Sequence, residues 1–333
     1  MVEHPSPTLA GSKTAIVARL IASNARAWLS SKLGNIGSSS GSTHSTLSIP
    51  QSLDYIRAVF EDYVAYGRLD DATIAGKKIL EIGPGDNLGV GLCFLLRGAS
   101  QVVCLDRFFS HRDEAQQRAI YTAFRSSRTP AEQATLDTFM SLDPAVHFDP
   151  SRLNYVSGIA IEDLVDPATR FDGFDLIVSR AVLEHVWDLD RALVAMDRVL
   201  NPGGRLIHKV DFRDHGIFTS RNHHPLSLLT VPGFFYTLAS RNSGKPNRRL
   251  IGDFRRILAR LGYKTQIWVP HLAGTTKEFV PHLSEHDVDA HLTDDAKALL
   301  DSIRPSLRPE FRDLPDHDLI IAGIFFVAEK PPR

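Results

Sequence analysis

Cysteine is scarce in this sequence of 333 residues, which contains only Cys93 and Cys104. Two cysteines form neither the framework of a disulfide-rich domain nor the paired spacing of a zinc site. Each lies in an apolar pattern, so we expect both to be buried as small apolar residues. Such cysteine usage is typical of a reducing compartment, and we predict a cytoplasmic protein.

Long hydrophobic runs and an excess of charge of one sign are also missing. The longest apolar stretch, near residues 319–328, is too short to cross a bilayer and is predicted to be a strand. The formal net charge is −1, so there is no overall basic field for nucleic acid, and we expect no nucleic-acid partner. The 43% hydrophobic content is that of an ordinary globular chain.

Acidic residues are absent from residues 4–53. Within this stretch, residues 13–33 show an amphipathic helical pattern, with Ile16, Leu20, Ala27 and Trp28 on one side. We expect a helix that packs on the main domain or covers its pocket; peripheral contact with a membrane is the alternative for a basic, acid-poor helix. The Gly/Ser/Thr-rich residues 34–48 predict a flexible linker. Residues 1–50 are therefore predicted to precede a main domain at 51–333.

The most informative pattern lies in residues 77–106. The apolar run 79–82 is followed by the turn Gly83-Pro84-Gly85, an apolar pattern at helical spacing, and a second apolar run that ends at Asp106. This order of strand, turn, helix, strand and acid is half of a nucleotide-binding α/β unit. Glycine allows a sharp turn and close approach of a ligand, and Asp106 is placed to accept hydrogen bonds from ribose hydroxyls.

The glycine spacing separates two classes of ligand. A dinucleotide fingerprint needs a third glycine three residues after the second, whereas Gly89 comes one residue late. The carboxylate of Glu81, just before the turn, suits a cationic ligand better than a pyrophosphate. The stretch 80–85 resembles the first motif of class I S-adenosylmethionine (SAM)-dependent methyltransferases. The resemblance implies SAM as cofactor, with Glu81 near its cationic amino-acid end, Gly83, Pro84 and Gly85 in the turn, and Asp106 and Arg107 at the ribose.

Two later segments extend the resemblance. Relatives recognise the adenine with an acid or amide after the third strand, but this chain has Ile159 there, so backbone contacts from Ile159 and Ala160, or a contact from Glu162, are predicted instead. Residues 174–186, which include Ser179 as a further predicted cofactor contact, and the turn at 201–204 match the corresponding family motifs.

The resemblance also implies a fold. We expect a doubly wound α/β sheet of seven mostly parallel strands in the order 3-2-1-4-5-7-6, with the last strand antiparallel and helices on both faces. Insertions are expected at about residues 107–152, 211–256 and 271–317, where they form caps or substrate walls.

Candidate catalytic residues stand where predicted strands end. A sulfonium brings its own leaving group, so the protein mainly orients the acceptor, and a general base helps if the acceptor is a hydroxyl. His185 follows the fourth predicted strand, and Asp211 and His215 follow the fifth. We predict methyl transfer to a small-molecule or carrier-linked acceptor, as O-methylation, with these three residues as catalytic candidates.

The segment 211–256 is rich in cations and aromatic residues, which suits an anionic or sugar-bearing acceptor, although a solvated basic face gives the same pattern. Its members are Arg213, Phe218, Arg221, His223, His224, Phe234, Phe235, Tyr236, Arg241, Lys245, Arg248 and Arg249.

Three alternatives remain open at this stage. The first is an NAD(P)-dependent oxidoreductase on the same type of fold, and the second is a non-catalytic methyltransferase-like protein. The third is a metal site at His282, His286 and His291, but His291 lies off the helical face that the other two would share, so no metal is predicted. The sequence leaves the oligomeric state open.

Overall fold

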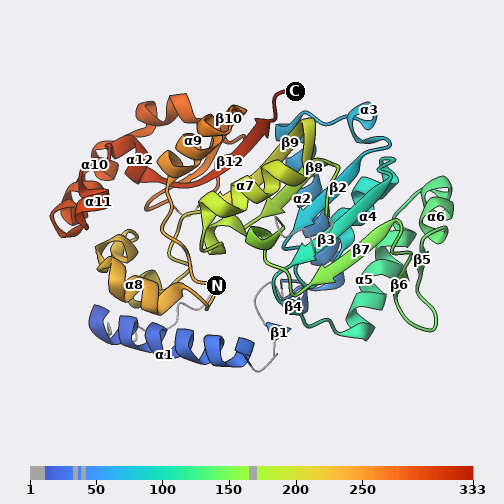
Figure 1. The fold of residues 1–333 in the computed structure, drawn as a ribbon, viewed down its shortest axis with the longest axis horizontal. Helices are drawn as coiled ribbons and strands as arrows, with labels where there is room; N and C mark the ends of the chain where they lie inside the picture. The colour runs from blue at the N-terminus through green and yellow to red at the C-terminus, as the bar shows by residue number, and fades with distance from the viewer. Residues whose placement is uncertain (1–11, 33–36, 39–42, 165–170, 276, 333) are drawn as a thin grey trace.

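The computed structural model describes residues 12–32, 37–38, 43–164, 171–275 and 277–332. Its centre is an eight-stranded sheet with the strand order β11-β10-β12-β9-β8-β2-β3-β7 (Figure 1). The strands are β2 (Lys78–Ile82), β3 (Gln101–Asp106), β7 (Leu153–Ser157), β8 (Phe174–Arg180), β9 (Leu200–Asp211), β10 (Lys264–Leu272), β11 (Leu283–Ser284) and β12 (Ile321–Glu329).

The order of the seven longer strands confirms the predicted topology. Strands β7, β3, β2, β8 and β9 pair in parallel, and β12 lies antiparallel between β9 and β10. In order of first appearance along the chain this is 3-2-1-4-5-7-6, with the last strand antiparallel. The two-residue strand β11 adds a short edge that was not predicted.

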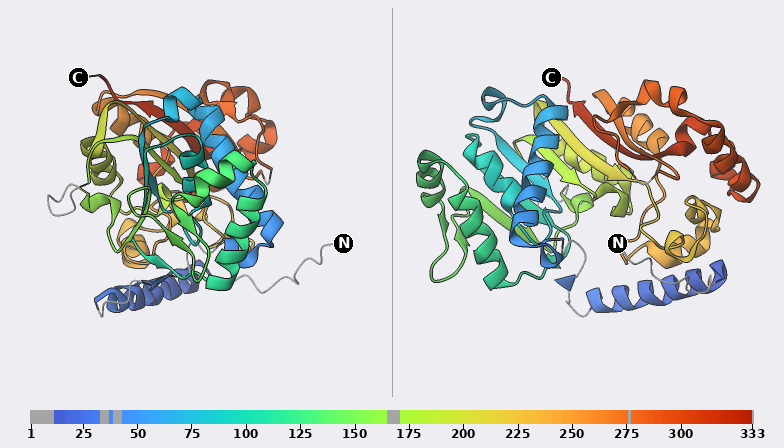
Figure 2. Two further views of the ribbon diagram at one scale, coloured as in Figure 1. Left: turned by 90° about the vertical axis from the view of Figure 1, so that its right-hand side faces the viewer. Right: turned by 180° about the vertical axis from the view of Figure 1, so that it is seen from behind.

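Helices cover both faces of the sheet (Figure 2). One face packs against α7 (Leu189–Val199) and α9 (Ile251–Arg260), and the other against α2 (Ile49–Gly67), α4 (Gly89–Leu96) and α5 (Glu114–Ser126). The continuous apolar runs of the parallel strands follow from this double cover. In β2, Leu80 and Ile82 belong to the first core, whereas Ile79 belongs to the second. Strand alternation therefore turns Glu81 toward α2 and α4.

The three predicted insertions contain most of the remaining elements. The first holds β4 (Phe109–Ser110), α5, α6 (Pro130–Asp137), β5 (Met140–Ser141) and β6 (His147–Phe148), and the second holds α8 (Gly233–Ser240). The third holds α10 (Asp294–Ile303), α11 (Pro309–Arg312) and α12 (Asp316–Ile320), and α3 (Asp71–Ile74) precedes β2.

The predicted N-terminal helix is α1 (Lys13–Lys32). It lies along α8 at the outer edge of the molecule (Figures 1 and 2), with Ile16 buried and the backbone N–H of Asn242 donating to Oδ1 of Asn24 at 2.7 Å. Of the predicted linker, β1 (Gly37–Ser38) pairs with β4, while residues 34–36 and 39–42 lie outside the described residues. Among the helices of the described part, none combines the length and the apolar character needed to cross a membrane.

Candidate active site

A cavity of about 530 Å³ opens at the carboxyl ends of the parallel strands. This is where open α/β sheets bind ligands. Eight of the predicted site residues line it: Gly83, Gly85, Asp106, Arg107, Ile159, Glu162, His185 and His215. The cavity is also lined by α1, through Ala27 and Ser30, and by residues 242–246 after α8.

The glycine turn presents bare backbone to this cavity. Gly83 and Gly85 have φ angles of +67° and +71°, in the left-handed region that favours glycine. The N–H of Gly83 donates to the carbonyl of Leu105 at 2.8 Å, and a Cβ on Gly83 would lie only 2.4 Å from Cγ2 of Val182. Val182 therefore leaves no room for a side chain at position 83, and both glycines line the cavity.

Arg112, which the sequence reasoning missed, holds the turn from outside. Its Nη2 donates to the carbonyl of Gly85 at 3.0 Å, and its guanidinium lies 3.9 Å from the centre of the Tyr155 ring. Arginine stacks on aromatic rings while it donates in its own plane, so Arg112 can make both contacts at once.

Asp106 ends β3 at the wall of the cavity. Its carboxylate accepts from the N–H of Phe108 at 3.3 Å and from the hydroxyl of Ser110 at 3.4 Å. Burial raises the pKa of Asp106 above its usual range, although these hydrogen bonds work in the opposite direction. Both interactions are long, so the carboxylate keeps capacity to accept hydrogen bonds from a ligand.

Glu81 lies in a different place from its neighbours in the motif. It lines a small cavity of about 40 Å³ on the α2 side of the turn, together with Pro84, and is absent from the lining of the large one. Burial raises the pKa of Glu81 to about 7, and within the described residues the Cys104 thiol donates a hydrogen bond to Oε2 of Glu81 at 3.4 Å. The two cavities share Ile82 and Gly83, so Glu81 stands behind the turn.

Three other predicted residues do not line either cavity. Ser179 is fully buried, and its hydroxyl lies 2.6 Å from Nδ1 of His208 in the neighbouring strand β9, so it forms a hydrogen bond inside the sheet. Ala160 lies between two lining residues, Ile159 and Ile161. Asp211 stands behind His215, where Arg213 binds its carboxylate through Nε at 2.8 Å and Nη2 at 2.7 Å.

Two histidines and two acids converge at the far end of the large cavity. The rings of His185 and His215 meet edge to face with centroids 4.8 Å apart. Nε2 of His215 lies 3.9 Å from Oε1 of Glu184 and 3.8 Å from Oδ2 of Asp211. The sequence reasoning missed Glu184, although it immediately precedes the predicted catalytic residue His185. Its position beside His215 arises from two segments that lie 31 positions apart in the sequence.

The pKa values of the two acids are shifted in opposite directions. Burial, assisted by the charge of Asp211, raises the pKa of Glu184 well above its usual range. Burial would also raise the pKa of Asp211, but hydrogen bonds from Arg213 outweigh that effect and leave it lowered. Burial and the neighbouring His215 lower the pKa of His185 to about 4. At neutral pH His185 is neutral and Asp211 is ionised, and burial favours the protonated form of Glu184.

The cationic segment 211–256 is mostly engaged within the protein. Arg213 pairs with Asp211, Arg249 with Asp253, and the guanidinium of Arg248 lies 4.1 Å from the centre of the Tyr236 ring. Lys245 is its only Lys or Arg that lines the large cavity in the described residues. An anionic acceptor would therefore meet fewer cations than the composition suggests.

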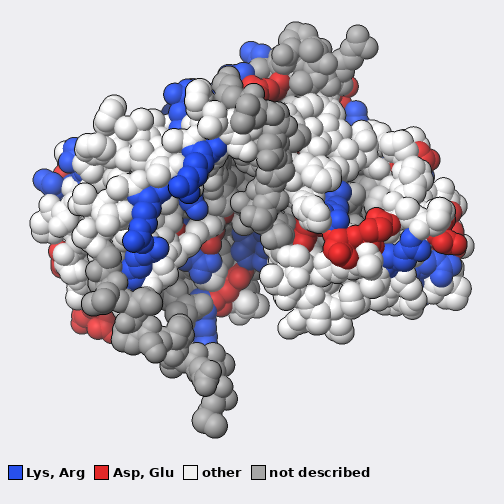
Figure 3. All heavy atoms as spheres, turned by 90° about the horizontal axis from the view of Figure 1, so that it is seen from below, with Lys and Arg blue, Asp and Glu red and all other residues white. Residues whose placement is uncertain are grey.

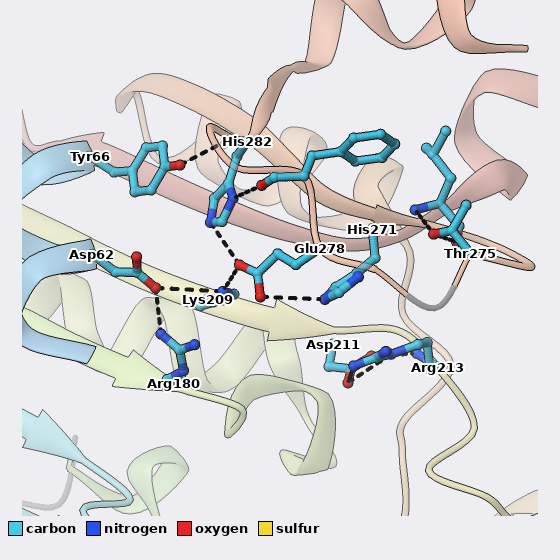
Figure 4. A network of polar contacts seen from close by, with 12 residues as sticks. Asp62, Tyr66, Arg180, Lys209, Asp211, Arg213, His271, Thr275, Glu278 and His282 are labelled. Atoms are coloured by element: carbon cyan, nitrogen blue, oxygen red, sulfur yellow. Dashed lines mark hydrogen bonds and ion pairs between the residues drawn. The ribbon is translucent and has the colours of Figure 1, made fainter. Parts of the chain in front are cut away.

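A second polar cluster joins β9, α2 and residues 278–282 (Figure 4). Lys209 in β9 contacts Glu278 and lies 3.5 Å from Asp62 in α2, which also pairs with Arg180 at 2.6 Å. Nε2 of His282 lies 3.4 Å from Glu278. Asp62, Glu278 and His282 are close enough to hold a metal ion, but the cations of Lys209 and Arg180 already balance the charges of the two acids. His286 and His291 do not join this group, so the three-histidine site considered from the sequence does not form in the described residues.

The methyltransferase-domain family model matches residues 56–266 of the chain. Among solved structures, Haemonchus contortus phosphoethanolamine N-methyltransferase 2 in complex with S-adenosyl-L-methionine is 16% identical with a TM-score of 0.42, covering 84% of this chain and 52% of that chain. The CurJ carbon methyltransferase is 14% identical with a TM-score of 0.36, covering 80% and 51%. A SAM-dependent methyltransferase from Mesorhizobium loti is 16% identical with a TM-score of 0.37, covering 79% and 94%.

The chain thus spans about half the length of the first two of these structures. A search of curated protein sequences gave no match.

Proposed function

The chain belongs to the SAM-dependent methyltransferases, and we propose that it methylates an oxygen of a small-molecule or carrier-linked acceptor held beside His215. The family membership sets aside the NAD(P)-dependent oxidoreductase considered from the sequence. The proposal rests on one observation: the same cavity is lined by the glycine turn, by Asp106 and by His215. The ionised carboxylate of Asp211 lies beside His215, outside the cavity lining.

The described residues fit SAM. Gly83 and Gly85 have positive φ angles and line the cavity, so a ligand there can lie against their backbone, and the turn leads into the N-terminal end of α4. We assign Asp106 to the ribose hydroxyls, Gly83 and Gly85 to the amino-acid end, and the backbone at Ile159 to the adenine. Arg107 remains a proposed neighbour of the ribose. When bound, SAM supplies an electrophilic methyl group on a positively charged sulfur.

Glu81 is assigned a less direct role than the family motif suggests. Because it stands behind the turn, we propose that its negative charge acts on the cationic end of SAM through the backbone of Gly83 rather than by contact. Pro84 shares the small cavity with Glu81 and is proposed to keep the turn rigid. For Ser179 and Ala160 we propose support of the strand end and the adenine segment.

His215 is the proposed general base. It takes the proton of the acceptor hydroxyl while the acceptor oxygen forms a bond to the methyl carbon and the carbon–sulfur bond breaks. The resulting imidazolium lies 3.8 Å from the ionised carboxylate of Asp211, which stabilises its charge. His185 is neutral and packs edge-on against His215, so we assign it to orienting that ring. Because burial favours the protonated form of Glu184, this acid is expected to stabilise the imidazolium less than Asp211 does.

Cofactor binding is tested by calorimetry with S-adenosylhomocysteine. Asp106→Ala should weaken binding about 100-fold because two hydrogen bonds to a charged group are lost. Asp301→Ala, an exposed acid on α10, is the matched control and should leave the affinity unchanged. Tight binding of NADH with none of S-adenosylhomocysteine would contradict the cofactor assignment.

Methyl transfer is tested with SAM that carries a deuterated methyl group, added to metabolite extracts and followed by mass spectrometry. The proposal expects a product labelled on oxygen. His215→Ala should lower its rate about 10²- to 10⁴-fold with little change in S-adenosylhomocysteine affinity, and Asp211→Asn should lower it less. His286→Ala, on the surface 3₁₀ segment, serves as control. Label on nitrogen or carbon would refute O-methylation, and cofactor binding without any labelled product would favour the non-catalytic alternative.

A further inference from the structure

Exposed apolar side chains are concentrated on α1 and α8. Among the described residues eight large hydrophobic side chains are exposed, and five of them lie on these two helices: Trp28, Leu29, Phe234, Phe235 and Leu238. The most exposed of the five is Phe234, at 71%. A group of exposed apolar side chains of this kind marks an interaction surface.

The aromatic side chains occupy one face of α8. Phe234 and Leu238 are four positions apart and Phe235 lies between them, so all three project to the same side of the helix. The rings of Phe234 and Phe235 contact each other with centroids 5.5 Å apart. Tyr236 and Ala239 are buried on the opposite side. The aromatic face is therefore turned away from the rest of the molecule.

The charges that α1 and α8 themselves contribute have one sign. Neither α1 nor α8 contains an acidic residue, and Arg19 and Arg26 on α1 and Arg241 directly after α8 are exposed. Figure 3 views the molecule from the side on which α1 lies: Lys and Arg form a row across that part of the surface, and the largest group of Asp and Glu lies on the other half. Aromatic side chains with flanking cations and no acids are typical of helices that lie in a membrane interface.

We propose that the α1–α8 face binds the surface of a membrane that contains anionic lipids. Phe234 and Phe235 enter the headgroup region, while Arg19, Arg26 and Arg241 pair with lipid phosphates. Charge complementarity selects this partner over a second copy of the chain, because two such faces would bring like charges together. The proposal uses only the outer face of the two helices and does not depend on the proposed function.

The location gives membrane binding a consequence for the enzyme. Ala27 and Ser30 of α1 and residues 242–246 after α8 form the outer wall of the large cavity. A membrane on the far side of these helices brings that wall next to the lipid surface. An acceptor held in the membrane would then meet the cavity without diffusing through solvent.

Vesicle co-sedimentation of the full chain tests the proposal. We expect binding to vesicles of equal parts phosphatidylcholine and phosphatidylglycerol, much weaker binding to phosphatidylcholine alone, and a decrease with added salt. Phe234→Ser/Phe235→Ser should lower the partition coefficient at least about tenfold, and Arg19→Gln/Arg26→Gln about tenfold. The matched controls are Val280→Ser, at a site 84% exposed, and Arg198→Gln/Lys264→Gln, two exposed cations elsewhere; both should bind as the wild type does.

Three results would overturn the proposal. The first is equal binding to both kinds of vesicle, and the second is mixed-vesicle binding that the phenylalanine and arginine variants leave unchanged. The third is a dimer in sedimentation velocity that Phe234→Ser/Phe235→Ser dissociates while no vesicle is bound, which would assign the face to self-association. Retained S-adenosylhomocysteine affinity shows that each variant is folded, and the single variant Leu238→Ser replaces the double one if that affinity is lost.

Discussion

Gly83→Ala is the substitution that most directly tests the geometry of the cofactor turn. The change adds one carbon, which would lie 2.4 Å from Cγ2 of Val182. Carbon atoms in contact are about 3.5–4.0 Å apart, so Val182 or the turn must move by about 1 Å. The φ angle of +67° also places the new alanine in the left-handed region.

The two effects have separable magnitudes. Left-handed strain costs about 1–2 kcal/mol, of which the lower unfolded-state entropy of alanine offsets about 0.5 kcal/mol. Overpacking against Val182 adds about 1–3 kcal/mol. Gly203 provides the control, because its φ is +73° and no atom lies within 4 Å of the position of its Cβ. Gly203→Ala should therefore cost only about 1 kcal/mol, and Gly83→Ala about 2–4 kcal/mol.

Urea unfolding and calorimetry with S-adenosylhomocysteine measure the outcome. Gly83→Ala should also weaken S-adenosylhomocysteine at least about tenfold, since a turn displaced by 1 Å no longer fits the ligand, whereas Gly203→Ala should not. Val182→Ala removes the clashing methyl groups and leaves the Val182 Cβ 3.5 Å away. The double variant Gly83→Ala/Val182→Ala should recover the overpacking part, so the double-mutant cycle should show about 1–3 kcal/mol of coupling. Equal destabilisation by Gly83→Ala and Gly203→Ala, with no coupling, would refute the reasoning.

Three further predictions concern the buried polar groups and the outer helix. The pKa of Glu81 is raised from 4.5 to about 7, so the folded protein keeps a proton that the unfolded chain releases, and the free energy of unfolding falls as pH rises between these values. In Glu81→Gln this fall between pH 5 and pH 8, measured by urea titration, should be smaller by at most about 3 kcal/mol. The same fall in the variant and the wild type would contradict the prediction. Lys209→Met leaves Asp62 and Glu278 without their shared cation and should lower the free energy of unfolding by about 3 kcal/mol. Lys264→Met, on the surface, should lower it by about 0.5 kcal/mol or less. A similar decrease in both variants would argue against the network. Asn24→Ala removes the hydrogen bond to Asn242 and should speed tryptic cleavage within α1 about fivefold, as measured by peptide mapping. An α1 that is cleaved no faster than in the wild type would disprove this prediction.

Local patterns determined much of the fold. The apolar runs, the turn at 83–85 and the helical spacing up to Gly98 correspond to β2, β3 and α4, because φ, ψ and side-chain spacing are properties of neighbouring residues. Cys93 and Cys104 are buried, as their apolar surroundings predicted. The strand order came from the family resemblance rather than from spacing, since no single strand encodes its neighbours.

The composition of the cavity was decided by tertiary structure. Glu81 belongs to the motif by sequence, but strand alternation places it behind the turn, in the small cavity. Glu184 and His215, 31 positions apart, become neighbours only because the segments after β8 and β9 leave the sheet side by side. The outer wall depends on α1 packing on α8 more than 200 positions later. Sequence patterns indicate the local geometry of neighbouring residues. Contacts between distant segments arise when whole helices and strands bury their apolar faces against each other, and this packing determines which side chains line the same cavity.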